Sequence, residues 1–252
     1  MSKPIVVITG ASAGIGAATA RRFGKEGYRV VALARRLDKL QELQKEIGAH
    51  CSVEEVDVTS ADQVKEVIER IEKKLGPIAI LVNNAGAAFG IEPAQQCKLE
   101  DWKKCVDVNI NGVLYCTHAV LPLMVQRNLG HIINLGSIAG HYAYPGGNVY
   151  GGTKAFLHQF SLNLRADLLG TKVRVSCIEP GLVGGSEFSV IRFRGDEKRA
   201  KGIYEQANAL EVDDIAEVIY FCAAVPSRVN INTIEVMPVT QAPAALTVHR
   251  ST

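Results

Sequence analysis

The chain has 252 residues, with 28 Lys and Arg against 26 Asp and Glu, so its formal net charge is +2. A 47% hydrophobic share with 21% charged residues is typical of a globular protein and excludes an intrinsically disordered chain. The near-neutral balance offers no basic face for nucleic acid or for an anionic membrane. No apolar run reaches the roughly 18 residues of a membrane span, and no signal peptide precedes the first apolar segment. We therefore expect a cytoplasmic protein with one domain over residues 1–252.

The cysteines are scattered, and no C-x-x-C pair occurs. In a long chain without a signal peptide, this distribution predicts reduced and mostly buried thiols. A structural metal site would require tighter clustering with the histidines, so we predict no metal. The six cysteines are Cys51, Cys97, Cys105, Cys116, Cys177 and Cys222.

Short β-branched runs alternate with helical periods along most of the chain. A helix is clearest over residues 64–75, where apolar residues recur at helical spacing behind a candidate capping box of Ser60 and Gln63. This alternation predicts a Rossmann-type, doubly wound parallel α/β sheet of about seven strands, with helices on both faces. The expected strands are residues 5–8, 30–33, 52–56, 78–82, 132–135, 173–178 and 233–237.

The alternation breaks near the carboxyl end of the chain. Residues 184–210 lack a clean strand, and we predict a loop-and-helix flap over the site. A helix over residues 212–224 follows. The apolar tail, residues 238–252, is predicted to pack on this subunit or on a neighbouring one.

A glycine-rich segment follows the first expected strand and leads directly into a helix. Glycines there let backbone N–H groups approach a pyrophosphate at the helix N-terminus. The spacing is G-x-x-x-G-x-G rather than G-x-G-x-x-G, and a plain tight turn is the alternative. The segment is Thr9, Gly10, Ala11, Ser12, Ala13, Gly14, Ile15 and Gly16.

Two arginines follow the second expected strand, where an NAD enzyme places an acidic residue for the ribose. The guanidinium groups of Arg35 and Arg36 suit a 2′-phosphate instead, so NADP is favoured over NAD. Asp38 fits the first turn of the next helix better than a ribose contact. The alternative is a solvated basic turn.

The next two strand ends carry further candidate cofactor contacts. Asp57 and Val58 follow the third strand and are candidates for the adenine end of the cofactor. The small residues of Asn84-Ala85-Gly86 follow the fourth strand and would let the nicotinamide ribose lie close to the backbone. Each of these motifs, taken alone, is also an ordinary turn.

A group of polar residues points to acid–base chemistry. Tyr150 and Lys154 are four residues apart and share a helix face, so both point into one cleft. A nearby ammonium lowers the pKa of a phenol from its usual value of about 10. Ser137, after the fifth strand, can bond the reacting oxygen, and Asn109 can support the site from the preceding helix; a helix-kinking amide is the alternative for Asn109.

The combined motifs resemble those of the short-chain dehydrogenase/reductase family. The resemblance spans the chain and rests on T-G-A-S-A-G-I-G, N-N-A-G, Pro180-Gly181 and the tetrad of Asn109, Ser137, Tyr150 and Lys154. It implies hydride transfer between NADP(H) and an alcohol carbon, with Tyr150 as acid/base and Asn109 anchoring a water-based proton relay. The implied cofactor contacts are Gly10, Ser12, Ala13, Gly14, Ile15, Arg35, Arg36, Asp57, Val58, Asn84, Ala85, Gly86, Tyr150, Lys154, Pro180, Gly181, Val183 and Ser186.

Further segments resemble the NADP-dependent 3-hydroxy acid dehydrogenases of this family. These segments are Trp102, G-G-N-V-Y at 146–150, E-P-G-L-V-G-G-S-E-F at 179–188 and N-I-N-T at 230–233. The resemblance implies small substrates such as serine, allo-threonine, or 3-hydroxypropionate and its product malonic semialdehyde. It also implies that the protein forms a homotetramer.

A carboxylate substrate needs a cation, and our hypothesis is that Arg192 pairs with it, alongside Ser137 and Tyr150 at the reacting oxygen. A solvated arginine on the flap is the alternative for Arg192. A broad carbonyl reductase of ketones or steroids is the alternative activity. A non-catalytic NADPH-sensing module is more remote, because such modules typically lose the tyrosine or the lysine.

Overall fold

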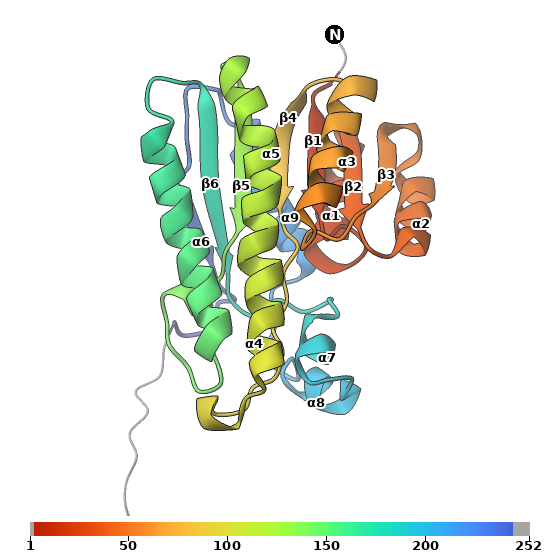
Figure 1. Ribbon diagram of the computed structural model, residues 1–252. Helices are drawn as coiled ribbons and strands as arrows, with labels where there is room; N and C mark the ends of the chain where they lie inside the picture. The colour runs from red at the N-terminus through yellow and green to blue at the C-terminus, as the bar shows by residue number, and fades with distance from the viewer. Residues whose placement is uncertain (1–2, 244–252) are drawn as a thin grey trace, which may run out of the picture.

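The computed structural model describes residues 3–243, so residues 244–252 of the predicted tail lie outside the described part. Seven parallel strands form one sheet in the order β3-β2-β1-β4-β5-β6-β7 (Figure 1). The predicted sheet is confirmed, with strand ends differing by one or two residues. The strands are β1 Ile5–Thr9, β2 Arg29–Ala34, β3 Cys51–Glu55, β4 Ile78–Asn83, β5 Gly130–Leu135, β6 Val173–Pro180 and β7 Thr233–Val236.

Helices cover both faces of the sheet because its central strands are apolar on both sides. In β1, Val6 and Ile8 face one core, while Ile5 and Val7 face the other. The first core is covered by α1 Gly14–Lys25, α2 Leu37–Ile47 and α9 Val212–Ala224. The second is covered by α3 Ala61–Lys74, α5 Gly112–Gln126 and α6 Asn148–Asp167.

One continuous helix runs from Leu99 to Gln126. It consists of α4 Leu99–Val106, the π-helical segment η3 Asp107–Asn111 and α5. Its length and composition alone would suit a membrane span, but here it packs against α3, α6, β4 and β5 as part of a layer of the fold (Figure 1). Asn109, for which a helix-kinking amide was the alternative interpretation, lies in the π-helical segment.

Only half of the predicted capping box forms at the start of α3. The Ser60 hydroxyl accepts a hydrogen bond from the Gln63 backbone N–H at 3.4 Å. The Gln63 side chain turns away and accepts from the Asp57 backbone N–H at 3.0 Å. The amide therefore fastens the loop after β3 to the helix instead of closing the box.

Two short helices, α7 Phe188–Arg192 and α8 Glu197–Gly202, lie within the segment predicted as a flap. They sit beyond the carboxyl ends of the strands (Figure 1). A parallel bridge between Val183 and Leu210 closes the base of the segment. Hydrogen bonds from Gly184 N to Leu210 O at 2.7 Å and from Leu210 N to Leu182 O at 3.0 Å reinforce it. Three other short turns are η1 Gly48–His50, η2 Ala94–Gln96 and η4 Ile138–Gly140.

Candidate active site

The loops after β1 and β4 meet where the strand order reverses, which is the usual ligand position in an open parallel sheet. The Asn84 side chain donates to Thr9 O at 2.8 Å and to Gly10 O at 3.2 Å. The Thr9 hydroxyl in turn accepts from the backbone N–H groups of Asn84 and Ala85, both at 3.0 Å. These bonds hold the N-N-A-G loop against the glycine loop.

The start of α1 is shaped for close approach of an anion. Gly10 has φ +67°, and a Cβ there would lie 2.9 Å from the Cα of Ala85. A Cβ on Gly16 would lie 2.5 Å from the Asn84 side-chain nitrogen. Ala13 is the N-cap residue, and within the described chain no side chain caps the helix and its first turn holds no acidic residue. The free N–H groups and the helix dipole therefore suit a pyrophosphate.

Arg36 reaches both the glycine loop and the flap. Its guanidinium donates to the Ser12 hydroxyl at 3.1 and 3.3 Å and forms a two-point pair with the Glu187 carboxylate at 2.8 and 3.0 Å. Arg35 is also exposed, and in the described chain its side chain forms no hydrogen bond or salt bridge. Nothing in the sequence indicated that Glu187 pairs with Arg36, because the two residues are 151 positions apart.

Asp57 and Val58 lie at the end of β3, away from the main cavity. The Asp57 carboxylate accepts from Thr59 N at 3.0 Å and from the Thr59 hydroxyl at 2.8 Å, as in an Asx turn. Val58 is 8% exposed and packs on the face of α5 at Gly112. The structure thus gives both residues a local structural role, and their predicted adenine contacts stay predictions.

A cavity of about 480 Å³ lies at the carboxyl ends of the strands and beneath the flap. It is large enough for a small substrate and the nicotinamide end of a dinucleotide, since ligand pockets typically start near 300 Å³. Gly10, Ser12, Ala13, Gly14, Arg35, Arg36, Asp57, Val58, Ala85 and Asn109 lie outside its lining. The predicted site residues that line it are Ile15, Asn84, Gly86, Ser137, Tyr150, Lys154, Pro180, Gly181, Val183, Ser186 and Arg192.

Ser137, Tyr150 and Lys154 come together in this cavity. Ser137 follows β5 and is 9% exposed; its hydroxyl accepts from Ala139 N at 3.1 Å. Tyr150 and Lys154 lie one turn apart on α6, with the ammonium 5.8 Å from the centre of the phenol ring. Lys154 donates to Leu135 O at 2.6 Å, which ties α6 to the end of β5.

Burial dominates the electrostatics of the pair on α6. Burial raises the pKa of the Tyr150 phenol well above its usual value, while the Ser137 hydroxyl and the positive charge of Arg192 oppose this rise. Burial lowers the pKa of Lys154 to about 8. The sequence suggested that Lys154 lowers the pKa of Tyr150. The effect of Lys154 on the phenol stays a prediction: its ammonium lies near the Tyr150 ring but donates to Leu135 O, and Arg192 is a second cation that opposes the rise in the pKa of Tyr150.

The buried pKa of Lys154 predicts how the cofactor-free protein responds to pH. In the unfolded chain a lysine has a pKa of about 10.4, so burial of the ammonium costs stability below pH 8 and this cost is relieved as the pH rises. We expect the unfolding free energy of the wild type, relative to Lys154→Met, to rise by about 2 kcal/mol between pH 8 and roughly pH 10. Urea denaturation of both proteins at the two pH values measures this difference in unfolding free energy. If the unfolding free energy of both proteins changed equally with pH, the prediction would be contradicted.

Asn109 is 1% exposed, and its side chain is fully engaged. The amide nitrogen donates to Ala87 O and to the Thr153 hydroxyl, both at 2.9 Å, and the amide oxygen accepts from Ala87 N at 2.8 Å. These bonds join the loop after β4 to α6 one residue before Lys154. Asn109 therefore holds together the elements that form the site, and this positioning role does not need the predicted water relay.

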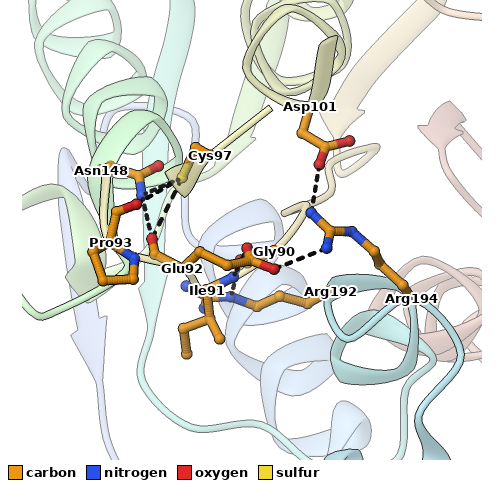
Figure 2. A network of polar contacts seen from close by, with 9 residues as sticks. All are labelled: Gly90, Ile91, Glu92, Pro93, Cys97, Asp101, Asn148, Arg192 and Arg194. Carbon is orange, nitrogen blue, oxygen red and sulfur yellow. Dashed lines mark hydrogen bonds and ion pairs between the residues drawn. The ribbon is translucent and has the colours of Figure 1, made fainter. Parts of the chain in front are cut away.

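Arg192 lies in the cavity rather than in solvent. Its guanidinium lies 5.6 Å from the centre of the Tyr150 ring and 5.3 Å from that of Tyr144. It also donates to Gly90 O at 3.2 Å (Figure 2). A second bond to Gly146 O at 3.1 Å means that it fastens α7 to two loops. The structure thus excludes the solvated-arginine alternative for this residue.

Arg194 anchors the same flap further from the cavity. Its guanidinium bridges Glu92 and Asp101, each at 2.8 Å, which links α7 to α4 and to the loop after β4 (Figure 2). The sequence offered no signal for these ion pairs or for the stacking of Arg192 on Tyr144. The partners are far apart in the chain, and no regular spacing connects them.

Comparisons with known proteins agree with this architecture. The family model described as short chain dehydrogenase matches residues 4–192. An NADP-dependent 3-hydroxy acid dehydrogenase of Salmonella typhi is 52% identical over 247 residues, which cover 98% of this chain and 100% of that protein. A serine 3-dehydrogenase of Agrobacterium fabrum is 46% identical over 245 residues, which cover 97% of this chain and 98% of that protein.

A solved structure of the closed form of a serine dehydrogenase complexed with NADP⁺ superposes with a TM-score of 0.96 at 51% identity. The match covers 98% of this chain and 100% of that chain. The similarity thus extends over the glycine loop, the cavity and the flap. The chain belongs to the short-chain dehydrogenase family.

Proposed function

We propose that this protein is an NADP-dependent oxidoreductase that interconverts small 3-hydroxy acids and their 3-oxo products. Serine, allo-threonine and the pair of 3-hydroxypropionate and malonic semialdehyde are the candidate substrates. The observation that carries the substrate class is the Arg192 guanidinium, which lines the cavity next to Tyr150. A fixed cation beside the acid–base residue suits a substrate with a carboxylate a short distance from its hydroxyl. The names of the relatives from Salmonella typhi and Agrobacterium fabrum support the same class.

Four cavity residues have distinct proposed roles. NADP⁺, when bound, supplies the acceptor for the hydride that leaves the substrate carbon. Tyr150 removes the proton from the substrate hydroxyl during oxidation and returns it during reduction. Ser137 donates a hydrogen bond to the substrate oxygen, and Lys154 holds the nicotinamide ribose. The charge of Arg192 opposes the rise that burial causes in the pKa of Tyr150, and it thereby favours the phenolate that accepts the proton.

The site fits the diphosphate and the 2′-phosphate of NADP. The uncapped N-terminus of α1 and the close-approach glycines Gly10 and Gly16 would hold the diphosphate. Arg36, already bonded to Ser12 beside that loop, would hold the 2′-phosphate, with Arg35 adjacent. Glu187 shares the Arg36 guanidinium, so binding of this phosphate and the position of the flap are linked.

Removal of the Arg36 guanidinium is expected to weaken NADP⁺ specifically. Arg36→Ser should raise the KM for NADP⁺ about tenfold and leave the KM for NAD⁺ nearly unchanged, because only NADP⁺ carries the 2′-phosphate. Steady-state kinetics with each cofactor measures both KM values. The control is Arg21→Ser, which removes an exposed arginine of α1 that pairs with Glu46 near the carboxyl end of α2. Equal losses for both cofactors would contradict the role of Arg36.

The proposed function is tested by following NADPH formation with a panel of alcohols. Purified protein is given NADP⁺ or NAD⁺ with L-serine, L-allo-threonine, 3-hydroxypropionate or a plain secondary alcohol. Preference for the acids with NADP⁺ supports the proposal. Activity on the plain alcohol alone would favour the carbonyl reductase. Binding of NADPH without any turnover would favour the sensing module.

We also propose that the protein is cytoplasmic and forms a homotetramer. All six cysteines are free thiols, which suits a reducing compartment. Leu99 and Val125, near the two ends of the long helix, are 56% and 39% exposed. Contact with another copy of the chain would remove this apolar surface from water and so stabilise the assembly. Light scattering coupled to size-exclusion chromatography measures the assembly, and a monomer at micromolar concentration would contradict the tetramer.

A further inference from the structure

We propose that His141, His158 and Glu179 form a binding site for one divalent transition-metal ion, with Zn²⁺ as the preferred ion. The scattered histidines and cysteines of the sequence predicted no metal site. The fold nevertheless brings one potential ligand atom of each of these three residues within 4.8 Å of the others. None of the three is among the described residues that line the main cavity, so the cluster is separate from the proposed catalytic site.

The three side chains come from three different elements. His141 directly follows η4, His158 lies on α6 one turn beyond Lys154, and Glu179 lies in β6 just before Pro180. Each histidine directs one ring nitrogen to a different oxygen of the carboxylate: His141 Nε2 lies 3.0 Å from Oε2, and His158 Nδ1 lies 2.8 Å from Oε1. The two rings meet edge to face, with centroids 4.4 Å apart.

These distances are close to those of a coordinated ion. Ligand atoms at about 2.0–2.1 Å from Zn²⁺ in tetrahedral geometry are roughly 3.3 Å apart from one another. The nitrogen–oxygen distances of 2.8 and 3.0 Å need to open by only a few tenths of an ångström. Small rotations of the two histidine side chains, which are 30% and 25% exposed, supply that change.

The charge balance around Glu179 favours a cation. Its side chain is 2% exposed, and within residues 3–243 neither lysine nor arginine forms a salt bridge with it. A buried carboxylate is costly unless a cation or several hydrogen bonds compensate it. Among the described residues, only imidazole groups and the Cys177 thiol lie within bonding distance of its oxygens. A divalent ion between the three residues would neutralise the carboxylate and use the histidines in their neutral form.

The donor set selects the class of ion. Two imidazole nitrogens and one carboxylate oxygen are the protein ligands of His₂Glu zinc sites, in which water takes the fourth position. Mg²⁺ and Ca²⁺ prefer sites made entirely of oxygen ligands. Because both histidines are partly exposed, water can reach the fourth position here. The bound ion would tie η4, β6 and α6 together directly behind Ser137, Tyr150 and Lys154.

The experiment uses the full chain without a histidine tag, after dialysis against a chelator. After Zn²⁺ is added back and the excess is removed by gel filtration, we expect one Zn²⁺ per chain by elemental analysis; addition of Co²⁺ to the metal-free protein should give a visible d–d absorption band. Zn²⁺ at 100 times its Kd is expected to raise Tm by about 5–10 °C, whereas Mg²⁺ leaves Tm unchanged. His141→Gln and His158→Gln should each abolish the Co²⁺ band and the Tm shift.

Two matched controls should keep metal binding. His118→Gln removes an exposed histidine of α5, and Cys97→Ser removes the thiol that is only partly buried. Absence of Zn²⁺ from the wild type, or equal binding by wild type and His141→Gln, would overturn the site. Circular dichroism checks the folding of each variant. If His158→Gln does not fold, His141→Gln decides, because its side chain is the more exposed of the two.

Discussion

Replacement of Tyr150 by phenylalanine is expected to lower kcat for a 3-hydroxy acid by about 10³–10⁴-fold, because the substrate hydroxyl loses its proton acceptor. The substitution removes one oxygen and keeps the ring. The contact of that ring with Phe188, at 5.5 Å between centroids, and with the Arg192 guanidinium, at 5.6 Å, should persist. We therefore expect the flap to keep its position and the affinity for NADPH to change little.

The measurement pairs turnover with cofactor binding. NADPH formation gives kcat, and isothermal titration calorimetry gives the Kd of NADPH for wild type and variant. Tyr142→Phe is the matched control, since Tyr142 also lines the cavity but its hydroxyl contacts Glu235 at 3.3 Å. A Tyr150→Phe protein that keeps more than about one tenth of wild-type kcat would refute the assignment of Tyr150 as acid/base.

Replacement of Arg192 by methionine is expected to lower kcat/KM for 3-hydroxypropionate about 100-fold and for an uncharged alcohol only a few-fold. A charge-assisted hydrogen bond in a partly buried site contributes up to about 3 kcal/mol, and only the acid makes that bond. The few-fold loss on the neutral alcohol reflects the weaker hold of α7 on Gly90 and Gly146 and the lost charge beside Tyr150.

Arg194→Met separates substrate recognition from anchoring of the flap. Arg194 holds the same flap through Glu92 and Asp101 but does not line the cavity among the described residues. We expect this variant to lose equal and modest activity on the acid and on the alcohol. If Arg192→Met also loses equally on both substrates, its guanidinium does not bind the carboxylate.

The pattern of apolar residues was sufficient to predict the sheet. Strands such as Ile5–Thr9 are buried at every position and apolar at all but the last, as expected of strands that are covered on both faces. Once the strands are parallel, the residues after them must gather at one edge, and there Ser137 and Asn84 line one cavity together with Tyr150 and Lys154 of α6. The match at residues 212–224 was exact, because the apolar period and the boundaries of α9 coincide.

Details that depend on what a side chain faces were not accessible from local spacing. The sequence predicted that Lys154 acts on the phenol of Tyr150, which stays a prediction; the structure adds the bond of that ammonium to Leu135 O and the charge of Arg192 near the same ring. Asn109 was expected to anchor a proton relay, which stays a prediction, and the structure adds that its side-chain amide is fully bonded within the protein. For both side chains, the hydrogen-bond partners come from other elements of the fold, so local spacing in the sequence does not reveal them.

The sequence by itself determined the parallel sheet, the glycine loop and the order of the polar residues at the strand ends, because each rests on short-range periodicity and on the geometry of single elements. Only the tertiary structure decided the pairing of Arg36 with Glu187 and the cluster of His141, His158 and Glu179. These contacts join residues between 17 and 151 positions apart. No periodic pattern encodes such distances; they follow from how the packed helices, the flap and the sheet edge meet.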